Sequence, residues 1–277
     1  MQIQILDKKE NEASFILKGT NSVYINTLRR IMLSEVPTLA IDEVNFIRND
    51  SALYDEIIAH RLGLIPLKTD LKSYDTPEKC GCKGKGCSKC QLKIVLRAKG
   101  PLTVYSSELQ PQDSKIKPVY DKMPITLLLK GQKLEFEAIA KLGIGKEHIK
   151  FSPGIFYYRA YPQIEIKQSK CTSCKKCVEV CPKKIYSFED NKLKINNLID
   201  CDLCNACVEV CKDEAIIISP SKEDFIFYIE SFGQLTSQQI LAEALNVFDN
   251  KLDEFAKKLK ASEEGKITKI KKRIARK

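Results

Sequence analysis

The chain has 277 residues, of which 43% are hydrophobic and 30% are charged, an ordinary balance for a soluble globular protein. No apolar run approaches the ~20 residues that a membrane-spanning helix needs, and the first residues alternate instead of forming a signal peptide. We therefore expect a cytoplasmic protein of about two domains, which excludes membrane-embedded and secreted classes.

The first part of the chain predicts a β-hairpin followed by a helix. Apolar and polar residues alternate over residues 3–5 and 15–17, on either side of a polar turn. Thr20 or Asn21 can cap the helix, which Pro37 ends. One face of this helix is apolar and carries Tyr24, Ile25, Leu28, Ile31 and Met32.

The middle of the chain predicts mostly strands. Residues 41–46 look extended and residues 53–64 look helical. Strict alternation over residues 94–98 and 134–138 predicts two more strands, and the prolines between them mark loops. A further strand is expected to begin at Phe156.

The last part of the chain predicts a strand at residues 225–231 and then a long helix. Thr236 and Gln239 have the spacing of a capping box. Behind them runs a narrow apolar stripe with alternating spacings of four and three residues, formed by Leu241, Leu245, Phe248, Leu252, Phe255 and Leu259. This stripe either packs against the chain's own sheet, as amphipathic helices commonly do, or binds a partner helix.

All twelve cysteines fall into three tight groups of four, a pattern that points to metal sites and not to a disulfide framework. The first group reads CxC-x4-CxxC and consists of Cys80, Cys82, Cys87 and Cys90. Four sulfurs in so short a glycine-rich stretch predict a closed, structural zinc site. Disulfides, another iron–sulfur cluster and unoccupied thiols remain alternatives.

The other two groups form a repeat: CTSCKKCVEVCP begins at Cys171 and CDLCNACVEVCK begins thirty residues later at Cys201. This repeat resembles a bacterial-type ferredoxin, in which the fourth cysteine of each motif binds the cluster of the other motif. The resemblance implies two [4Fe–4S] clusters. The first would be held by Cys171, Cys174, Cys177 and Cys211, and the second by Cys201, Cys204, Cys207 and Cys181.

The formal charge of +10 is uneven, because the last thirteen residues hold seven positive charges and no acid. These charges are Lys266, Lys269, Lys271, Lys272, Arg273, Arg276 and Lys277. Such a tail could approach nucleic acid or an acidic partner, or it could be a frayed, solubilising terminus.

Catalytic residues are scarce. The only histidines are His60 and His148, and no nucleophile, base and orienting group suggest themselves. We expect no active site in this chain.

Four ordered blocks carry a resemblance to a known family. They are TNSVYINTLRRIMLSEVPTLAIDEV (20–44), LYDEIIAHRLGLIPL (53–67), the cysteine knuckle and GIGKEHIKFSP (143–153). With the ferredoxin-like insertion they resemble, over essentially the whole chain, the alpha-like component of archaeal DNA-directed RNA polymerase that is designated D. This family is similar to the N-terminal domain of the bacterial alpha subunit and to the third-largest subunit of eukaryotic RNA polymerase II.

The resemblance implies an α+β fold built on a split dimerisation domain, residues 1–40 and 221–277. A mostly-β insert domain at residues 41–165 would carry the knuckle, and a ferredoxin-like domain would occupy residues 166–220. The implied function is a noncatalytic assembly scaffold. It would form a heterodimer with the small subunit L, recruit the large catalytic subunits, join other small polymerase subunits, and contact DNA only indirectly.

The resemblance also gives roles to the two helices. Tyr24, Leu28 and the C-terminal stripe would pack against subunit L, whereas Arg29 and Arg30 could meet a carboxylate of a large subunit or stay solvated. The competing hypothesis is a ferredoxin-type electron-transfer subunit of an oxidoreductase, although no flavin or nicotinamide fingerprint is present. We favour structural clusters, because ligation across both motifs closes the insertion on itself.

Overall fold

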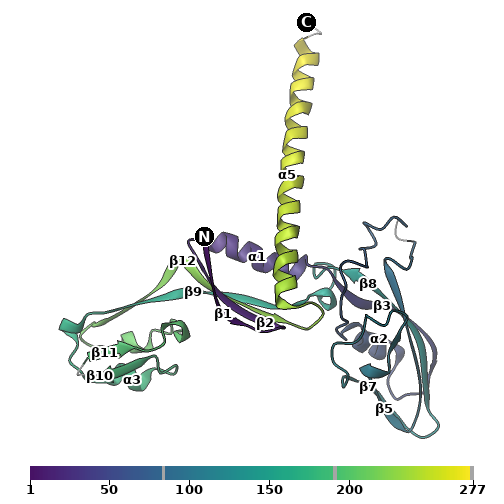
Figure 1. Cartoon of the computed structure of the whole chain (residues 1–277), viewed down its shortest axis with the longest axis horizontal. Helices are drawn as coiled ribbons and strands as arrows, with labels where there is room; N and C mark the ends of the chain where they lie inside the picture. The colour runs from purple at the N-terminus through teal and green to yellow at the C-terminus, as the bar shows by residue number, and fades with distance from the viewer. Residues whose placement is uncertain (83–84, 190–191, 275–277) are drawn as a thin grey trace. The chain divides into compact units, whose positions relative to one another are not determined.

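The computed structural model describes residues 1–82, 85–189 and 192–274, with the side chains of the last helix given up to Ser262. It is an α+β structure, as expected (Figure 1). The chain divides into two compact units. One unit contains residues 1–8, 14–26 and 157–228, and the other contains residues 9–13, 27–156 and 229–277. The domain boundaries expected from the sequence remain a prediction.

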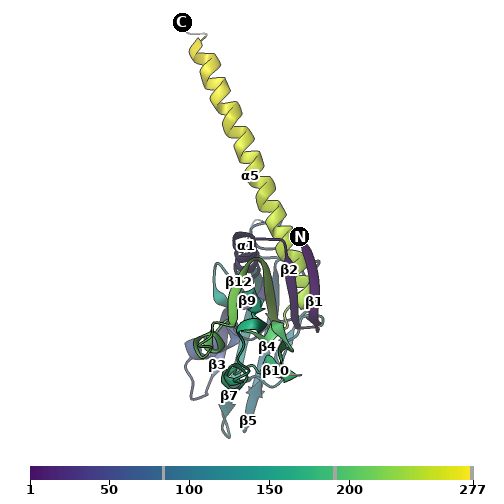
Figure 2. The same ribbon diagram turned by 90° about the vertical axis from the view of Figure 1, so that its left-hand side faces the viewer.

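The first unit is built around a four-stranded sheet whose strands come from the beginning, middle and end of the chain. The order is β1 (Gln2–Lys8), β2 (Glu12–Lys18), β12 (Ile216–Ser231) and β9 (Gly154–Ile166). Both views show these strands side by side (Figure 1, Figure 2). The predicted hairpin is confirmed. Phe15 of β2 stacks on Phe227 of β12 with 5.4 Å between ring centroids, which joins segments far apart in sequence.

Helix α1 (Ser22–Ser34) begins where the sequence predicts. Of the two candidate caps, Asn21 is the one used, because its side-chain oxygen accepts a hydrogen bond from the Tyr24 N–H at 2.9 Å. Four of the five predicted apolar positions are buried within this chain, namely Ile25, Leu28, Ile31 and Met32.

The ferredoxin-like segment connects β9 to β12. It contains α3 (Lys176–Val180), α4 (Ala206–Glu209), the paired strands β10 (Tyr186–Glu189) and β11 (Lys192–Ile195), and the short 3-10 helices η3 (Gln168–Lys170) and η4 (Leu198–Asp200). Non-glycine residues with left-handed backbone recur thirty positions apart, as Ser173 and Leu203, Lys175 and Asn205, and Lys184 and Glu214. The repeat in the sequence is therefore also a repeat in the backbone.

The second unit contains the other four-stranded sheet and a small two-stranded one. The larger has the order β3 (Thr38–Asn49), β8 (Lys133–Gly143), β4 (Gln91–Lys99) and β6 (Gln110–Pro111), and the smaller pairs β5 (Leu102–Tyr105) with β7 (Pro124–Leu128). The short 3-10 helices are η1 (Ser106–Glu108) and η2 (Ile149–Phe151). The two alternating runs predicted as strands pair with each other, with Leu96 opposite Phe136. Helix α2 (Asp55–Gly63) buries Ile58 and Leu62 in the same core.

A partly buried ion cluster joins three elements of this unit. The Asp42 carboxylate of β3 meets Lys141 Nζ of β8 at 2.7 Å and Lys150 Nζ of η2 at 2.6 Å. Burial alone would raise the pKa of Asp42, but hydrogen bonds and charge attraction from the two lysines bring it below its ordinary value.

Helix α5 (Ser237–Ile274) is a single long helix in both views (Figure 1, Figure 2). Its predicted capping box is present: the Thr236 N–H donates to Gln239 Oε1 at 2.9 Å, and the Gln239 N–H donates to Thr236 Oγ1 at 3.2 Å. Along the part of α5 whose side chains are described, the buried hydrophobic residues are Ile240 and Ala244. None of the described helices has the length and apolarity needed to cross a membrane.

Candidate metal centres and partner surface

The four cysteines of the knuckle converge on one point just before β4. Their Sγ atoms lie within 4.8 Å of one another. The separations are 3.5 Å for Cys80–Cys87 and for Cys82–Cys90, and 3.8 Å for Cys87–Cys90. Four sulfurs placed tetrahedrally around zinc at the usual Zn–S distance lie about 3.8 Å apart. All twelve cysteines are free thiols, and these separations exceed the roughly 2.0 Å of a disulfide bond. The geometry fits a tetrahedral metal ion.

Backbone turns hold the knuckle in this shape. The Cys80 N–H donates to the Thr76 carbonyl, and the Cys90 N–H donates to the Cys87 carbonyl, each at 3.0 Å. Gly86 has a φ of +84°, and a β-carbon there would lie 2.3 Å from the Gln91 side chain, so a glycine is required.

The knuckle thiols titrate very differently. Hydrogen bonds from Cys90 and Cys80 lower the pKa of Cys82 to about 6. Burial raises the pKa of Cys90 to about 12. Metal binding here would therefore displace protons, because a thiolate is the ligand form of cysteine.

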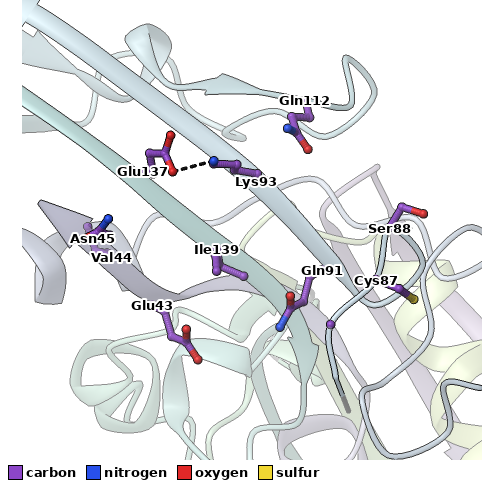
Figure 3. A pocket seen from close by; sticks show the side chains of 11 residues that line it. Glu43, Val44, Asn45, Cys87, Ser88, Gln91, Lys93, Gln112, Glu137 and Ile139 are labelled. Carbon is purple, nitrogen blue, oxygen red and sulfur yellow. Dashed lines mark ion pairs between the residues drawn. The ribbon is translucent and has the colours of Figure 1, made fainter. Parts of the chain in front are cut away.

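A polar cavity of about 550 Å³ lies beside the knuckle, on a face of the β3–β8–β4 sheet. Figure 3 shows Cys87 and Ser88 on one side of it and the Lys93–Glu137 ion pair, 2.6 Å long, on the other. The sequence did not point to this cavity, since its lining comes from three strands and the knuckle. The two charges largely neutralise each other, and we assign it no ligand.

The first set of expected cluster ligands lines a single cavity. Cys171, Cys174, Cys177 and Cys211 all contribute to it, so the fourth cysteine of the second motif does meet the first motif. Burial raises the pKa of the Cys177 thiol to about 11, with a further contribution from the neighbouring Cys171 and Cys174 thiols. The apolar side chains of Leu193 and Ile216 complete the wall. A low-dielectric cradle of four sulfurs is the donor set that a [4Fe–4S] cluster uses.

The structure likewise brings together the second set of expected ligands. Burial raises the pKa of Cys201, and the thiols of Cys204 and Cys181 act on it in the same direction. Burial also raises the pKa of Cys207, where Cys181 and Cys201 contribute. Cys181 of the first motif therefore lies among the cysteines of the second motif.

Sequence reasoning missed a group that fixes the second motif to the sheet. The guanidinium of Arg159 on β9 donates to the backbone carbonyls of Cys201 and Ile199. It also donates to the Tyr228 hydroxyl of β12, with Nε at 3.1 Å and Nη2 at 3.0 Å. No motif marks Arg159, because its partners lie at least forty residues away in sequence.

The residues expected to bind a partner fall into two kinds. Leu28 is 3% exposed and packs inside this chain, so its role in partner binding stays a prediction. The stripe on α5 is open: Leu245 is 39% exposed, Leu252 51% and Phe255 61%. Tyr24, Arg29, Leu241 and Phe248 are partly exposed, and Arg30 is exposed.

Helices α1 and α5 also share a groove. Its volume is about 220 Å³, and its lining includes Arg30 and Ile31 of α1 and Phe248 of α5. Lys251 of α5 closes one side through a 2.5 Å ion pair with Glu35. The exposed stripe therefore continues into a recess that a partner side chain could fill.

A sheet assembled from both ends of the chain, a mostly-β region with a cysteine knuckle and a two-motif cysteine insertion define an iron–sulfur member of the RNA polymerase alpha-like class. Family comparisons agree. Residues 23–154 match the RNA polymerase Rpb3/RpoA insert domain, and residues 165–216 match a 4Fe-4S dicluster domain.

Whole-chain relatives make the assignment specific. DNA-directed RNA polymerase subunit Rpo3 of Methanosphaera stadtmanae is 39% identical over 261 residues, covering 91% of this chain and 96% of the relative. The Archaeoglobus fulgidus subunit Rpo3 is 37% identical, with 92% and 97% covered, and that of Pyrococcus furiosus is 36% identical, with 94% and 97% covered.

The chain belongs to the Rpo3 family of archaeal DNA-directed RNA polymerase subunits. The family resemblance seen in the sequence is confirmed, and the alternative of an oxidoreductase subunit is not favoured.

Proposed function

We propose that this chain is a noncatalytic assembly scaffold of an archaeal RNA polymerase, which pairs with the small subunit L and then recruits the large catalytic subunits and other small subunits. The observation that carries the proposal is the exposed apolar stripe on α5. Leu245, Leu252 and Phe255 stand on one side of a helix that leaves its own core after Ala244. This supports the partner-binding interpretation over packing against the chain's own sheet.

The expected energetics favour a stable pair. Burying a leucine or phenylalanine side chain contributes about 1.5–3 kcal/mol. The stripe and the recess beside Phe248 offer several such side chains to one partner helix. Their combined burial is ample for a permanent heterodimer, in which the interface resembles a domain core.

The test is co-expression with subunit L followed by affinity capture. Leu252→Gln and Phe255→Gln keep good helix formers in place but remove apolar area. Each is expected to weaken binding by about tenfold or more, which corresponds to 1.4 kcal/mol. The matched control is Glu254→Gln, an exposed position on the same turn that lies outside the stripe. Equal capture of all three variants would contradict the proposal.

We also propose that two [4Fe–4S] clusters occupy the insertion in a structural role, with the ligand sets given above. Support comes from the shared cavity of the first set and from the mutual effects of the second set on their pKa values. Replacing Cys171 and Cys201 by serine should lower iron content and loosen residues 166–220, as measured by metal analysis and hydrogen exchange. Native exchange rates in an iron-depleted variant would rule out the structural role.

A zinc ion in the knuckle is the third component of the proposal. One zinc per chain is expected, and Cys87→Ser should release it. Because Cys90 is protonated at neutral pH without metal, acidification should weaken zinc binding, by about tenfold per pH unit for each proton displaced. A zinc affinity independent of pH would argue against thiolate ligation.

The remaining assignments follow from the family. We place the split dimerisation domain at 1–40 and 221–277, the insert domain at 41–165 and the ferredoxin-like domain at 166–220, in a protein of the cytoplasm. The basic residues from Lys266 onward lie beyond the described side chains of α5, so direct contact with nucleic acid stays a prediction. Loss of salt-dependent DNA binding on removing residues 265–277 would support it.

A further inference from the structure

The two halves of the ferredoxin-like segment differ at one buried position next to the cysteines. The thirty-residue repeat makes Ile216 the counterpart of Tyr186, just as Cys207 is the counterpart of Cys177. Tyr186 is 3% exposed and Ile216 is 2% exposed, so both side chains are part of the interior. A polar hydroxyl therefore occurs in one half where the other half has a hydrocarbon.

The hydroxyl of Tyr186 is in contact with a cysteine of the second set. The distance from its oxygen to Cys207 Sγ is 3.3 Å. An iron-bound cysteine is a thiolate and has no proton, so in the loaded protein the tyrosine must be the donor. Burial, followed by this hydrogen bond, raises the pKa of Tyr186 and keeps the proton on the hydroxyl.

The equivalent place in the first half has no such donor on its side chain. Ile216 lines the cavity that contains Cys177, the counterpart of Cys207. The first set does receive a backbone hydrogen bond, from the Ala215 N–H to Cys211 Sγ at 3.3 Å. The side-chain hydroxyl is thus an addition to one site, placed by a single substitution within the repeat.

We propose that the Tyr186 hydroxyl raises the reduction potential of the second cluster above that of the first. Reduction adds one electron to the cluster, and a hydrogen bond to a ligand sulfur stabilises the added negative charge. No proton is transferred, since the hydroxyl keeps its own. This inference rests on the two clusters proposed above.

The experiment is a redox titration of the full-length protein under anaerobic conditions, with dithionite as reductant and electron paramagnetic resonance as readout. Iron is counted first, and about eight atoms per chain are expected for two clusters. The unmodified protein should show two midpoints. In Tyr186→Phe the higher midpoint should fall by about tenfold in the one-electron reduction constant, which is 59 mV, and the lower should stay unchanged. Tyr186→Ile, which copies the first half, should bring the midpoints together.

The control is Tyr157→Phe, which removes the hydroxyl of a half-exposed tyrosine in the same unit and should move neither midpoint. Unchanged midpoints in Tyr186→Phe with full iron would overturn the inference and leave the two clusters standing. A variant that loses half its iron would show that the hydroxyl retains a cluster and does not set its potential, which also overturns the inference. About four irons in the unmodified protein would refute the two-cluster proposal itself.

Discussion

Individual side chains differ in how far the sequence announces them. The cysteines could be assigned to metal sites because thiolate ligands must converge, and short fixed spacings impose that convergence locally. Asp42 and Arg159 could not be assigned, because Lys150 is 108 positions from Asp42 and the nearest of the backbone partners of Arg159 in the second motif is 40 positions away. Only the folded sheets bring these charges to their partners.

The first prediction concerns Asp42→Asn. Removing the carboxylate leaves Lys141 and Lys150 facing each other in a partly buried site. The loss should be about 1–2 kcal/mol of local stability, between the values for exposed and buried pairs. Faster hydrogen exchange of the β3 and β8 amides would measure it.

The same ion cluster has a defined pH dependence. The pKa of Asp42 is lower in the folded chain than the unfolded value of about 3.9, so its stabilising effect is present above that pH and is lost as the pH falls through the folded pKa. The variant should therefore match the unmodified protein only in strong acid. Glu189→Gln, which breaks the exposed pair with Lys194, is the control and should change little. An equal effect of both variants would contradict the argument.

Secondary-structure elements were predictable where one period dominates. Strands β4 and β8 alternate strictly, and they pair in the register that places Leu96 opposite Phe136. Strand β12 begins nine residues before the predicted strand at Phe225, because Pro220 and the charges around it read as a loop. The stripe on α5 was visible, but only the structure separates packing inside the chain from an open surface.

The second prediction concerns Gly154→Ala at the start of β9. A β-carbon on Gly154 would lie 2.2 Å from the backbone carbonyl oxygen of Glu230, so a strand would have to shift. The cost should be about 1–3 kcal/mol, typical of overpacking, and should appear as a lower melting temperature. Gly63→Ala is the matched control, since its nearest atom would be at an ordinary 3.5 Å. Similar melting of both variants would count against the close approach.

The chain as a whole is organised by its insertion between neighbouring strands. β9 and β12 lie next to each other in the sheet, and the Lys167 N–H donates to the Ala215 carbonyl at 2.8 Å. The ferredoxin-like segment thus leaves and returns at one point. The cysteine repeat predicted the segment but not its base, because backbone pairing between residues so far apart leaves no local pattern.

The third prediction follows from that base. Replacing residues 168–214 by an Asn-Gly turn should join β9 and β12 as a simple hairpin. The sheet and the stripe on α5 should be retained, with iron binding lost and some stability lost from Arg159, whose carbonyl partners are removed. Circular dichroism, iron analysis and capture of subunit L would test this. A shortened chain that fails to fold would show that the insertion is required for the sheet.

Helix α5 also has a consequence for the fate of surplus chains. Its stripe is apolar and open until a partner covers it, so an orphan subunit displays the kind of surface that chaperones and proteases bind. Assembly hides that surface by the same contact that makes the chain useful. Cells could therefore balance the supply of this subunit against its partners by degradation alone, with no separate signal to mark the excess.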